Sequence, residues 1–235
     1  MNVSIIVPAL NEENYIESCL KSLKNQDFKG KYEIIVVDGN SKDNTVEIAK
    51  KYTKKVFKCK KGIARQRNYG AKLAKGNIFA FLDSDTIADK NWLSQLSKSF
   101  SKKDVVAVTG KLFPIEKTAP AKAYEAINHV QKNLIKINMP LFWGASCAFR
   151  KEAFEKLKGF NEKMKTSEDH DISLRMRKIG KVKFNSKMIA FTSYRRLETL
   201  DGWLEYISDA IIFPIKRSKE KCLKIIKNNG AREGI

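Results

Sequence analysis

Short apolar runs rich in β-branched residues alternate with segments of helical periodicity along the first half of the chain. The runs are too short for buried helices and end at proline, glycine or aspartate, so they predict buried strands. These strands lie at residues 3–8, 32–38, 55–58, 77–83 and 105–108. Apolar residues three or four positions apart predict helices at residues 16–23, 46–52, 64–74 and 92–100. Strands that alternate with helices indicate an α/β fold with a mostly parallel, doubly wound sheet of the nucleotide-binding type.

The second half of the chain is less regular. It predicts helices at residues 119–137 and 167–179, a loop with a strand at 142–150, and short strands at 182–184 and 188–191. From about Leu200 an apolar stripe with Trp203 and Phe213 precedes six basic residues and one acidic residue up to Lys227. Such an amphipathic helix suits an anionic membrane interface, or it packs on the domain instead.

Basic residues dominate the charge, since 46 Lys and Arg against 26 Asp and Glu give +20. Residues 50–75 hold eleven basic residues and no acidic one. Phosphorylated ligands, an anionic membrane and nucleic acid are candidate partners, and the amino-acid usage of the source organism is an alternative cause. Four scattered cysteines argue against a disulfide framework or a zinc site. With no long apolar run and no basic leader, we expect a cytoplasmic protein.

Polar side chains gather where three predicted strands end. The first strand leads into residues 8–13, the second into residues 38–45, and the fourth into Asp83 and Asp85. Ligands bind beyond the carboxyl ends of parallel strands, although each segment also suits a simple turn. Two carboxylates two residues apart can hold Mg²⁺ or Mn²⁺ on a nucleotide diphosphate. Arg65 and Arg67 lie at a predicted helix start, where phosphate is also favoured.

These segments, in this order, resemble the nucleotide-sugar-dependent glycosyltransferases of family 2, which have the GT-A fold. The resemblance covers residues 1 to about 195, with no single decisive motif. Its motifs are Val7–Glu12, Val36–Thr45, Arg65–Ala71, Ala74–Asn77, Leu82–Asp85, Arg150–Glu162 and Ser167–Gly180. It implies one GT-A domain at 1–196, with a nucleotide-sugar half at 1–110 and an acceptor half at 111–196, before an amphipathic basic helical segment at 197–235.

The resemblance also implies roles for individual residues. Asp38 would contact the base or ribose, Asp83 would face the ribose and donor sugar, and Asp85 would hold the metal with Asp83. The remaining nucleotide-sugar contacts would come from Pro8, Leu10, Asn11, Glu12, Arg65, Asn68, Ser84, Arg195 and Arg196. The implied donor is a UDP-sugar or a GDP-sugar, and the implied cofactor is Mg²⁺ or Mn²⁺.

The implied chemistry is an inverting hexosyl transfer to a glycan or a lipid-linked acceptor. Asp169 would be the general base, with Glu168 as the neighbouring alternative. If the acceptor is a lipid phosphate, it is already ionised and the base matters less. Trp143, Gly144 and Ala145 would shape the acceptor side, or they form a plain buried turn.

The sequence departs from the family pattern at two points, which concern polymer synthesis and the acceptor. The Gln-x-x-Arg-Trp motif of processive members is replaced by Tyr194, Arg195 and Arg196 with a later Trp203, which disfavours polymer synthesis. No acceptor-specific domain is recognisable. Three alternatives stay open: a catalytically inactive relative, a sugar nucleotidyltransferase and a basic nucleic-acid binder. The second lacks its Gly-rich loop after the first strand, and the third has few interleaved aromatics, so no nucleic-acid partner is expected.

Overall fold

A computed structural model describes residues 1–116, 121–142, 144–164 and 166–195. The chain divides into two compact units, Met1–Ser193 and Tyr194–Ile235, and the fold below is that of the first. Within the described residues, none of the helices combines the length and the apolar character needed to cross a bilayer. The predicted membrane-binding stripe from Leu200 to Lys227 lies outside the described residues.

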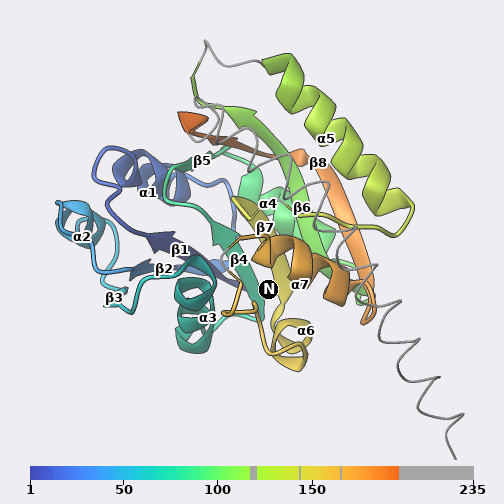
Figure 1. The fold of residues 1–235 in the computed structure, drawn as a ribbon, viewed down its shortest axis with the longest axis horizontal. Helices are drawn as coiled ribbons and strands as arrows, with labels where there is room; N and C mark the ends of the chain where they lie inside the picture. The colour runs from blue at the N-terminus through green and yellow to red at the C-terminus, as the bar shows by residue number, and fades with distance from the viewer. Residues whose placement is uncertain (117–120, 143, 165, 196–235) are drawn as a thin grey trace, which may run out of the picture. The chain divides into compact units, whose positions relative to one another are not determined.

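The described residues of this unit form an eight-stranded sheet at its centre, with the order β3-β2-β1-β4-β7-β6-β8-β5 (Figure 1). The strands are β1 (Asn2–Ala9), β2 (Lys31–Asp38), β3 (Val56–Lys58), β4 (Ile78–Leu82), β5 (Thr86–Ala88), β6 (Val105–Pro114), β7 (Ser146–Arg150) and β8 (Lys181–Thr192). The helices are α1 (Ile16–Lys24), α2 (Thr45–Lys50), α3 (Ile63–Leu73), α4 (Trp92–Ser99), α5 (Ala121–Lys136), α6 (Lys151–Lys156) and α7 (Glu168–Met176).

The predicted parallel sheet is confirmed for the first half of the chain. Strand β1 pairs in parallel with β2 and β4, and β2 pairs in parallel with β3. Helices cover both faces of this half, so strands β1, β2 and β4 are almost continuously apolar rather than alternating. Their carboxyl ends therefore lie along one edge of the sheet.

The second half adds two reversed strands to the predicted, mostly parallel sheet: β5 and β7 run against the direction that β1, β2, β3, β4, β6 and β8 share. Strand β7 runs antiparallel to both β4 and β6, and β5 runs antiparallel to β8. Among the strands described in this half, β6 and β8 pair in parallel. Register shifts let the predicted short strands at 182–184 and 188–191 join into one strand, β8. The sheet is therefore mixed, because hydrophobic periodicity reports the burial of a strand but not its direction.

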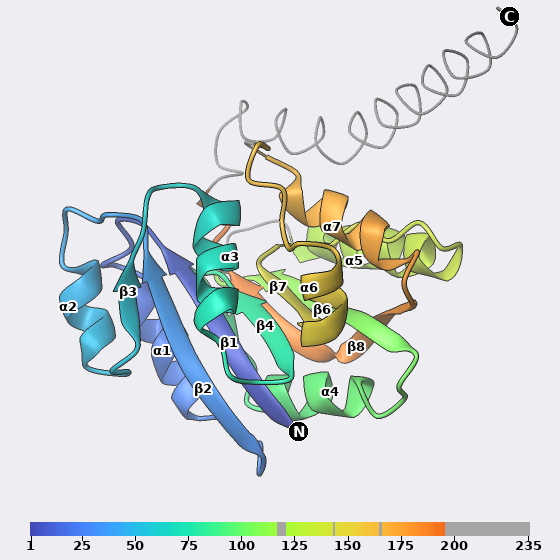
Figure 2. The same cartoon turned by 90° about the horizontal axis from the view of Figure 1, so that it is seen from below.

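Two apolar clusters hold the helices against opposite faces of the sheet (Figure 2). Helices α1, α2 and α4 contribute to one cluster, and α3, α6 and α7 contribute to the other. The indole N–H of the fully buried Trp92 donates to the Ser146 hydroxyl at 2.9 Å, which fixes α4 beneath β7. Packing on both faces makes the strand ends a rigid platform for polar side chains.

Candidate functional site

The loops that follow β1 and β2 are bonded to each other at the carboxyl edge of the sheet. The backbone N–H of Asn11, a residue in the left-handed region at φ 54°, donates to the Ser41 hydroxyl at 2.9 Å. The Asn11 amide oxygen accepts from the backbone N–H of Lys42 at 2.9 Å, and the N–H of Glu12 donates to the Thr45 hydroxyl at 2.7 Å. The predicted nucleotide-binding segments are thus joined into one structure.

Asp38 lies at the end of β2 and is fully buried. Its carboxylate accepts from the backbone N–H groups of Asn40 and Ser41 and from the Ser41 hydroxyl. These bonds build the turn, which is the simpler role that the sequence also allowed. Direct contact of Asp38 with a base or ribose stays a prediction.

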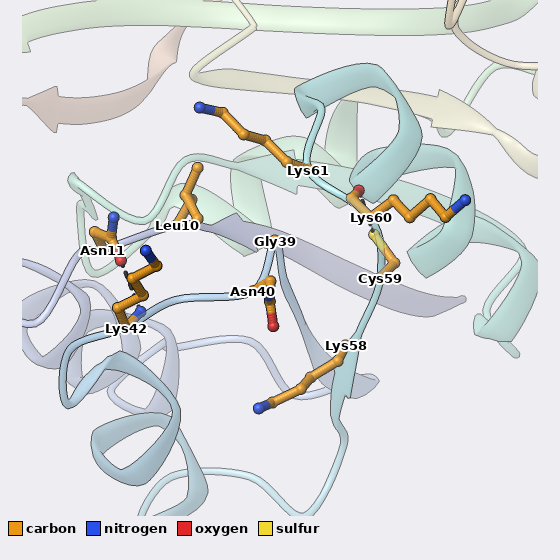
Figure 3. A pocket seen from close by; sticks show the side chains of 9 residues that line it. All are labelled: Leu10, Asn11, Gly39, Asn40, Lys42, Lys58, Cys59, Lys60 and Lys61. Atoms are coloured by element: carbon orange, nitrogen blue, oxygen red, sulfur yellow. Dashed lines mark hydrogen bonds between the residues drawn. The ribbon is translucent and has the colours of Figure 1, made fainter.

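A pocket of about 600 Å³ opens beside this turn (Figure 3). Its lining comes from the ends of β1, β2 and β3 and from the loop before α3. The lining residues are Leu10, Asn11, Gly39, Asn40, Lys42, Lys58, Cys59, Lys60 and Lys61. Two of the predicted nucleotide contacts, Leu10 and Asn11, therefore face a space of the size that small-molecule ligands occupy. Pro8 lies two residues before Leu10 and is buried within β1.

Asp83, Ser84 and Asp85 follow β4 directly. Ser84 and Asp85 are buried, whereas the side chain of Asp83 keeps 22% of its surface exposed. The thiol of Cys19 donates to the Asp83 carbonyl at 3.5 Å. Burial raises the pKa of Cys19, and the charges of Asp85, Asp83 and Glu12 raise it further. The thiol therefore stays protonated beside these acidic residues.

The donor atoms of Asp83 and Asp85 suit a hard divalent cation. The part of the chain that the structure describes contains no group of three His, Cys, Asp or Glu residues that would form a complete metal site. Mg²⁺ commonly uses one or two carboxylates and takes its other ligands from water and substrate phosphates. Two carboxylates at an open strand end therefore fit a cation that is held jointly with a diphosphate.

Arg67 is a site residue that the sequence pattern did not single out from Arg65. Its guanidinium is buried, and Nη2 bonds Asp83 Oδ1 at 2.7 Å while Nη1 bonds Glu168 Oε1 at 2.7 Å. These two carboxylates raise the pKa of Arg67, so it stays charged despite its burial. Arg65, two residues earlier on α3, is half-exposed, and its Nε lies 3.4 Å from a carboxylate oxygen of Glu162. Two residues apart on a helix, the two arginines face different surroundings, but the spacing does not show which of them is buried.

Glu168 and Asp169 begin α7, after Ser167 in the left-handed region at φ 61°. Burial and the neighbouring Asp169 raise the pKa of Glu168, although Arg67 opposes this. Asp169 is only partly buried, and its Oδ2 accepts from the backbone N–H of Gly144 at 2.6 Å. The environments of the two neighbouring carboxylates therefore differ: one is buried against a cation and the other remains accessible.

Gly144 and Ala145, predicted on the acceptor side, lie between the two groups of carboxylates. The Ala145 carbonyl accepts from the Asp83 N–H at 3.2 Å, while Gly144 bonds Asp169. A Cβ on Gly144 would lie 2.7 Å from Arg67 Nη2, so the close approach requires glycine. Trp143 and Arg196 lie outside the described residues, and Arg195 belongs to the second unit of the chain.

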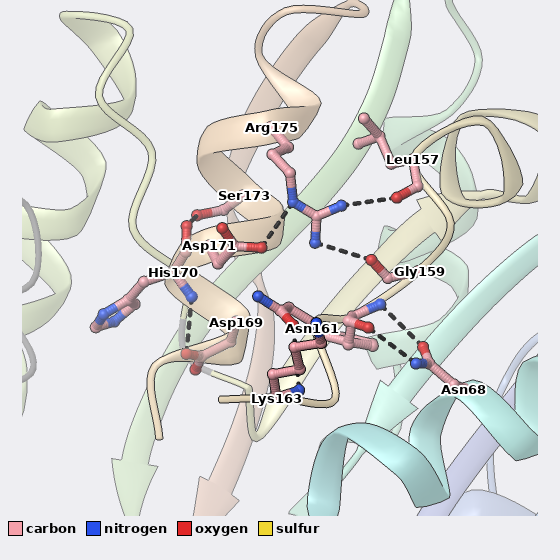
Figure 4. Close-up of polar contacts among 11 residues, drawn as sticks. Asn68, Leu157, Gly159, Asn161, Lys163, Asp169, His170, Asp171, Ser173 and Arg175 are labelled. Atoms are coloured by element: carbon pink, nitrogen blue, oxygen red, sulfur yellow. Dashed lines mark hydrogen bonds and ion pairs between the residues drawn. The ribbon is translucent and has the colours of Figure 1, made fainter. Parts of the chain in front are cut away.

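Asn68 holds the segment that precedes α7 (Figure 4). Its amide oxygen accepts from the Phe160 N–H at 2.9 Å, and its amide nitrogen donates to the Phe160 carbonyl and to Glu162. From the other side, Arg175 donates to the carbonyls of residues 157 and 159 and pairs with Asp171. The structure therefore uses Asn68 to position this segment, and a nucleotide contact of Asn68 stays a prediction.

Replacing Gly159 with alanine should lower stability by about 1–3 kcal/mol. Gly159 has φ +69°, and a Cβ there would lie 2.4 Å from the Asn68 amide oxygen. Thermal unfolding measures the loss. The control is Gly62→Ala, where φ is +140° but the nearest atom to a Cβ lies 3.7 Å away. Because alanine is more strained at φ +140° than at φ +69°, a loss in Gly159→Ala that equals or exceeds the loss in Gly62→Ala supports the contact with Asn68. A clearly smaller loss would show that backbone strain alone explains it.

The sequence model of Glycosyl transferase family 2 matches residues 4–158 of this chain. The chain belongs to this family. This confirms the resemblance and assigns the chain to the glycosyltransferases. Asp38, Arg67 and Asp83 lie inside the matched region, and Glu168 and Asp169 lie beyond it.

Two curated relatives show how far the similarity extends. Glycosyltransferase AglE of Haloferax volcanii is 33% identical over 140 residues, which are 55% of this chain and 46% of AglE. An uncharacterized glycosyltransferase of Rickettsia typhi is 26% identical over 218 residues, covering 88% of this chain and 68% of the relative. The match to AglE thus takes in less than half of that protein.

Solved structures share the fold. Staphylococcus aureus TarS in complex with UDP-GlcNAc matches with a TM-score of 0.68 and 24% identity, over 83% of this chain and 59% of that one. The mannosyltransferase PcManGT of Pyrobaculum calidifontis, in complex with GDP-Man and Mn²⁺, matches with a TM-score of 0.68 and 21% identity, over 81% of this chain and 56% of that one. At these identities the likeness establishes the GT-A fold and no more.

Proposed function

We propose that the protein is an inverting, metal-dependent glycosyltransferase that moves a sugar from a nucleotide diphosphate to an acceptor hydroxyl. One observation carries the proposal. Buried Arg67 joins Asp83, at the donor end of β4, to Glu168, at the start of α7, with 2.7 Å bonds on both sides. Asp169, the residue after Glu168, is therefore held near the carboxylates that would receive the donor.

Asp169 is better suited than Glu168 to act as the general base. Glu168 is committed to an ion pair with Arg67. Within the described residues the partly exposed Asp169 forms no ion pair, and its two oxygens accept the backbone N–H groups of Gly144 at 2.6 Å and His170 at 2.8 Å. Asp169 would remove the proton from the acceptor hydroxyl as its oxygen forms the bond to the anomeric carbon. The bond to the nucleoside diphosphate breaks on the opposite face, so one displacement inverts the anomeric centre.

Asp85 and Asp83 would hold the cation. A bound Mg²⁺ or Mn²⁺ would neutralise the charge that grows on the leaving diphosphate. Arg67 keeps one oxygen of Asp83 occupied, so the orientation of that carboxylate is fixed before any ligand arrives. Preorganisation of this kind avoids reorientation of the site during the reaction.

The names of similar proteins suggest the range of donors and acceptors. TarS, 40% identical over 101 residues, is a poly(ribitol-phosphate) β-N-acetylglucosaminyltransferase, and its solved complex holds UDP-GlcNAc. The complex of PcManGT holds GDP-Man and Mn²⁺. For this chain we propose a UDP- or GDP-sugar donor and a glycan or lipid-linked acceptor. A cytoplasmic location with peripheral membrane contact stays a prediction.

The cation site is tested by ligand-induced stabilisation. Nucleoside diphosphate with Mn²⁺ should raise the midpoint temperature of unfolding. At a ligand concentration one hundred times the dissociation constant, the free energy of unfolding should rise by about 2.7 kcal/mol. Asp85→Asn should lose the part of this shift that requires Mn²⁺, because an amide is a poorer cation ligand than a carboxylate. Asp104→Asn, an exposed site on the loop before β6, is the control. Retention of the full Mn²⁺-dependent shift in Asp85→Asn would exclude Asp85 as the ligand.

A further inference from the structure

The pocket beside the β2 turn is rich in hydrogen-bond donors. Among the described residues, four lysines and no carboxylate line it. Its side-chain acceptors are the amide oxygens of Asn11 and Asn40. The Asn11 oxygen already accepts from the Lys42 N–H at 2.9 Å. Within the described residues, no backbone N–H donates to the Asn40 side-chain oxygen in the same way. Among the side chains of the lining, a ligand therefore meets more donors than acceptors (Figure 3).

Acceptors on the strand ends beneath the pocket are also occupied. The carboxylate of Asp38 is filled by its own turn. The buried Gln66 amide donates to the carbonyl of Ala9 at 2.8 Å and to that of Val37 at 2.9 Å, and the Gly39 N–H also bonds Ala9. At the far wall, the Lys60 carbonyl accepts from the Cys59 thiol at 3.3 Å. The ligand must therefore bring its own acceptors.

We infer that this pocket selects the uracil of a uridine nucleotide over guanine, an inference that rests on the proposed donor site. Uracil presents two carbonyl acceptors and one N–H, which matches a lining that offers four lysine side chains as donors and one available amide oxygen. Guanine presents three N–H bonds on its pairing edge, from N1 and the exocyclic amine. Most of these would be left without acceptors, and unpaired polar hydrogens oppose binding.

Titration calorimetry with UDP and with GDP, each in Mn²⁺, tests the inference. UDP should bind about tenfold more tightly than GDP. Lys61→Glu places a carboxylate acceptor at the pocket, so it should reduce this ratio to about threefold or less. Both nucleotides carry the same diphosphate. Repulsion between the new charge and the phosphates therefore cancels in the ratio.

Lys75→Glu is the matched control, because it makes the same charge change on an exposed residue between α3 and β4, away from the pocket lining. The wild-type ratio should persist in this variant. Equal or tighter binding of GDP by the wild type would overturn the inference, as would an unchanged ratio in Lys61→Glu. Failure of both nucleotides to bind the folded wild type would instead overturn the proposed donor site itself.

Discussion

Asp169→Asn should retain donor binding and lose sugar transfer by about 10²–10⁴-fold, the usual contribution of a general base. Asparagine has the same shape, and its amide oxygen can still accept one of the two backbone N–H groups that Asp169 accepts, that of Gly144 at 2.6 Å or that of His170 at 2.8 Å. It cannot take a proton from the acceptor hydroxyl. The expected change is therefore in turnover, while the dissociation constant of the nucleoside diphosphate should stay near that of the wild type.

The rate is measured as release of nucleoside diphosphate, with the sugar nucleotide that the wild type turns over as the donor. Calorimetry gives the dissociation constant of the nucleoside diphosphate. Glu152→Gln, an isosteric charge loss at an exposed position on α6, is the control and should keep both. Undiminished turnover in Asp169→Asn would contradict its role as base. Loss of turnover in Glu168→Gln with donor affinity intact, together with an active Asp169→Asn, would move the role to Glu168.

The sequence predicts the parallel half of the sheet well because its strands are buried on both faces. Continuous apolar runs such as those of β1 and β4 can satisfy few other environments, and the helices between them have one apolar face. The three-residue β5 and the six-residue α6 were not predicted, although β3 and α2 have the same lengths and were, so length alone does not decide which short elements the pattern shows. The antiparallel β7 needed knowledge of where its neighbours lie.

The site was predictable to the extent that it follows strand ends. Asp83 and Asp85 stand out because they come directly after a buried strand. Arg67 does not, because one arginine in a basic helix resembles another until the fold is known. Its partner Glu168 lies 101 residues away in the chain, and no local pattern connects the two. The double role of Asp38, in the turn or on a ligand, likewise depends on hydrogen bonds that only the structure supplies.

Arg67→Met should destabilise the protein by about 3–5 kcal/mol, because it leaves two carboxylates beside an uncharged side chain. Methionine keeps much of the apolar volume, so loss of the charge is the main change. The midpoint of thermal unfolding should fall by about 10 °C for a chain of this size. Donor turnover should also fall at temperatures where the variant is still folded, because Asp83 and the start of α7 lose their common anchor.

Neutralising Glu168, a partner of Arg67, distinguishes the loss of the Arg67 charge from a simple loss of packing. The double variant Arg67→Met with Glu168→Gln should recover part of the stability, since one uncompensated charge is gone. The loss in Arg67→Met should also shrink as the pH falls. Burial already raises the pKa of Glu168, and removing Arg67 raises it further, so the folded state binds more protons than the unfolded state and gains stability towards acid. A loss that neither acid nor Glu168→Gln reduces would mean that Arg67 contributes packing and not charge.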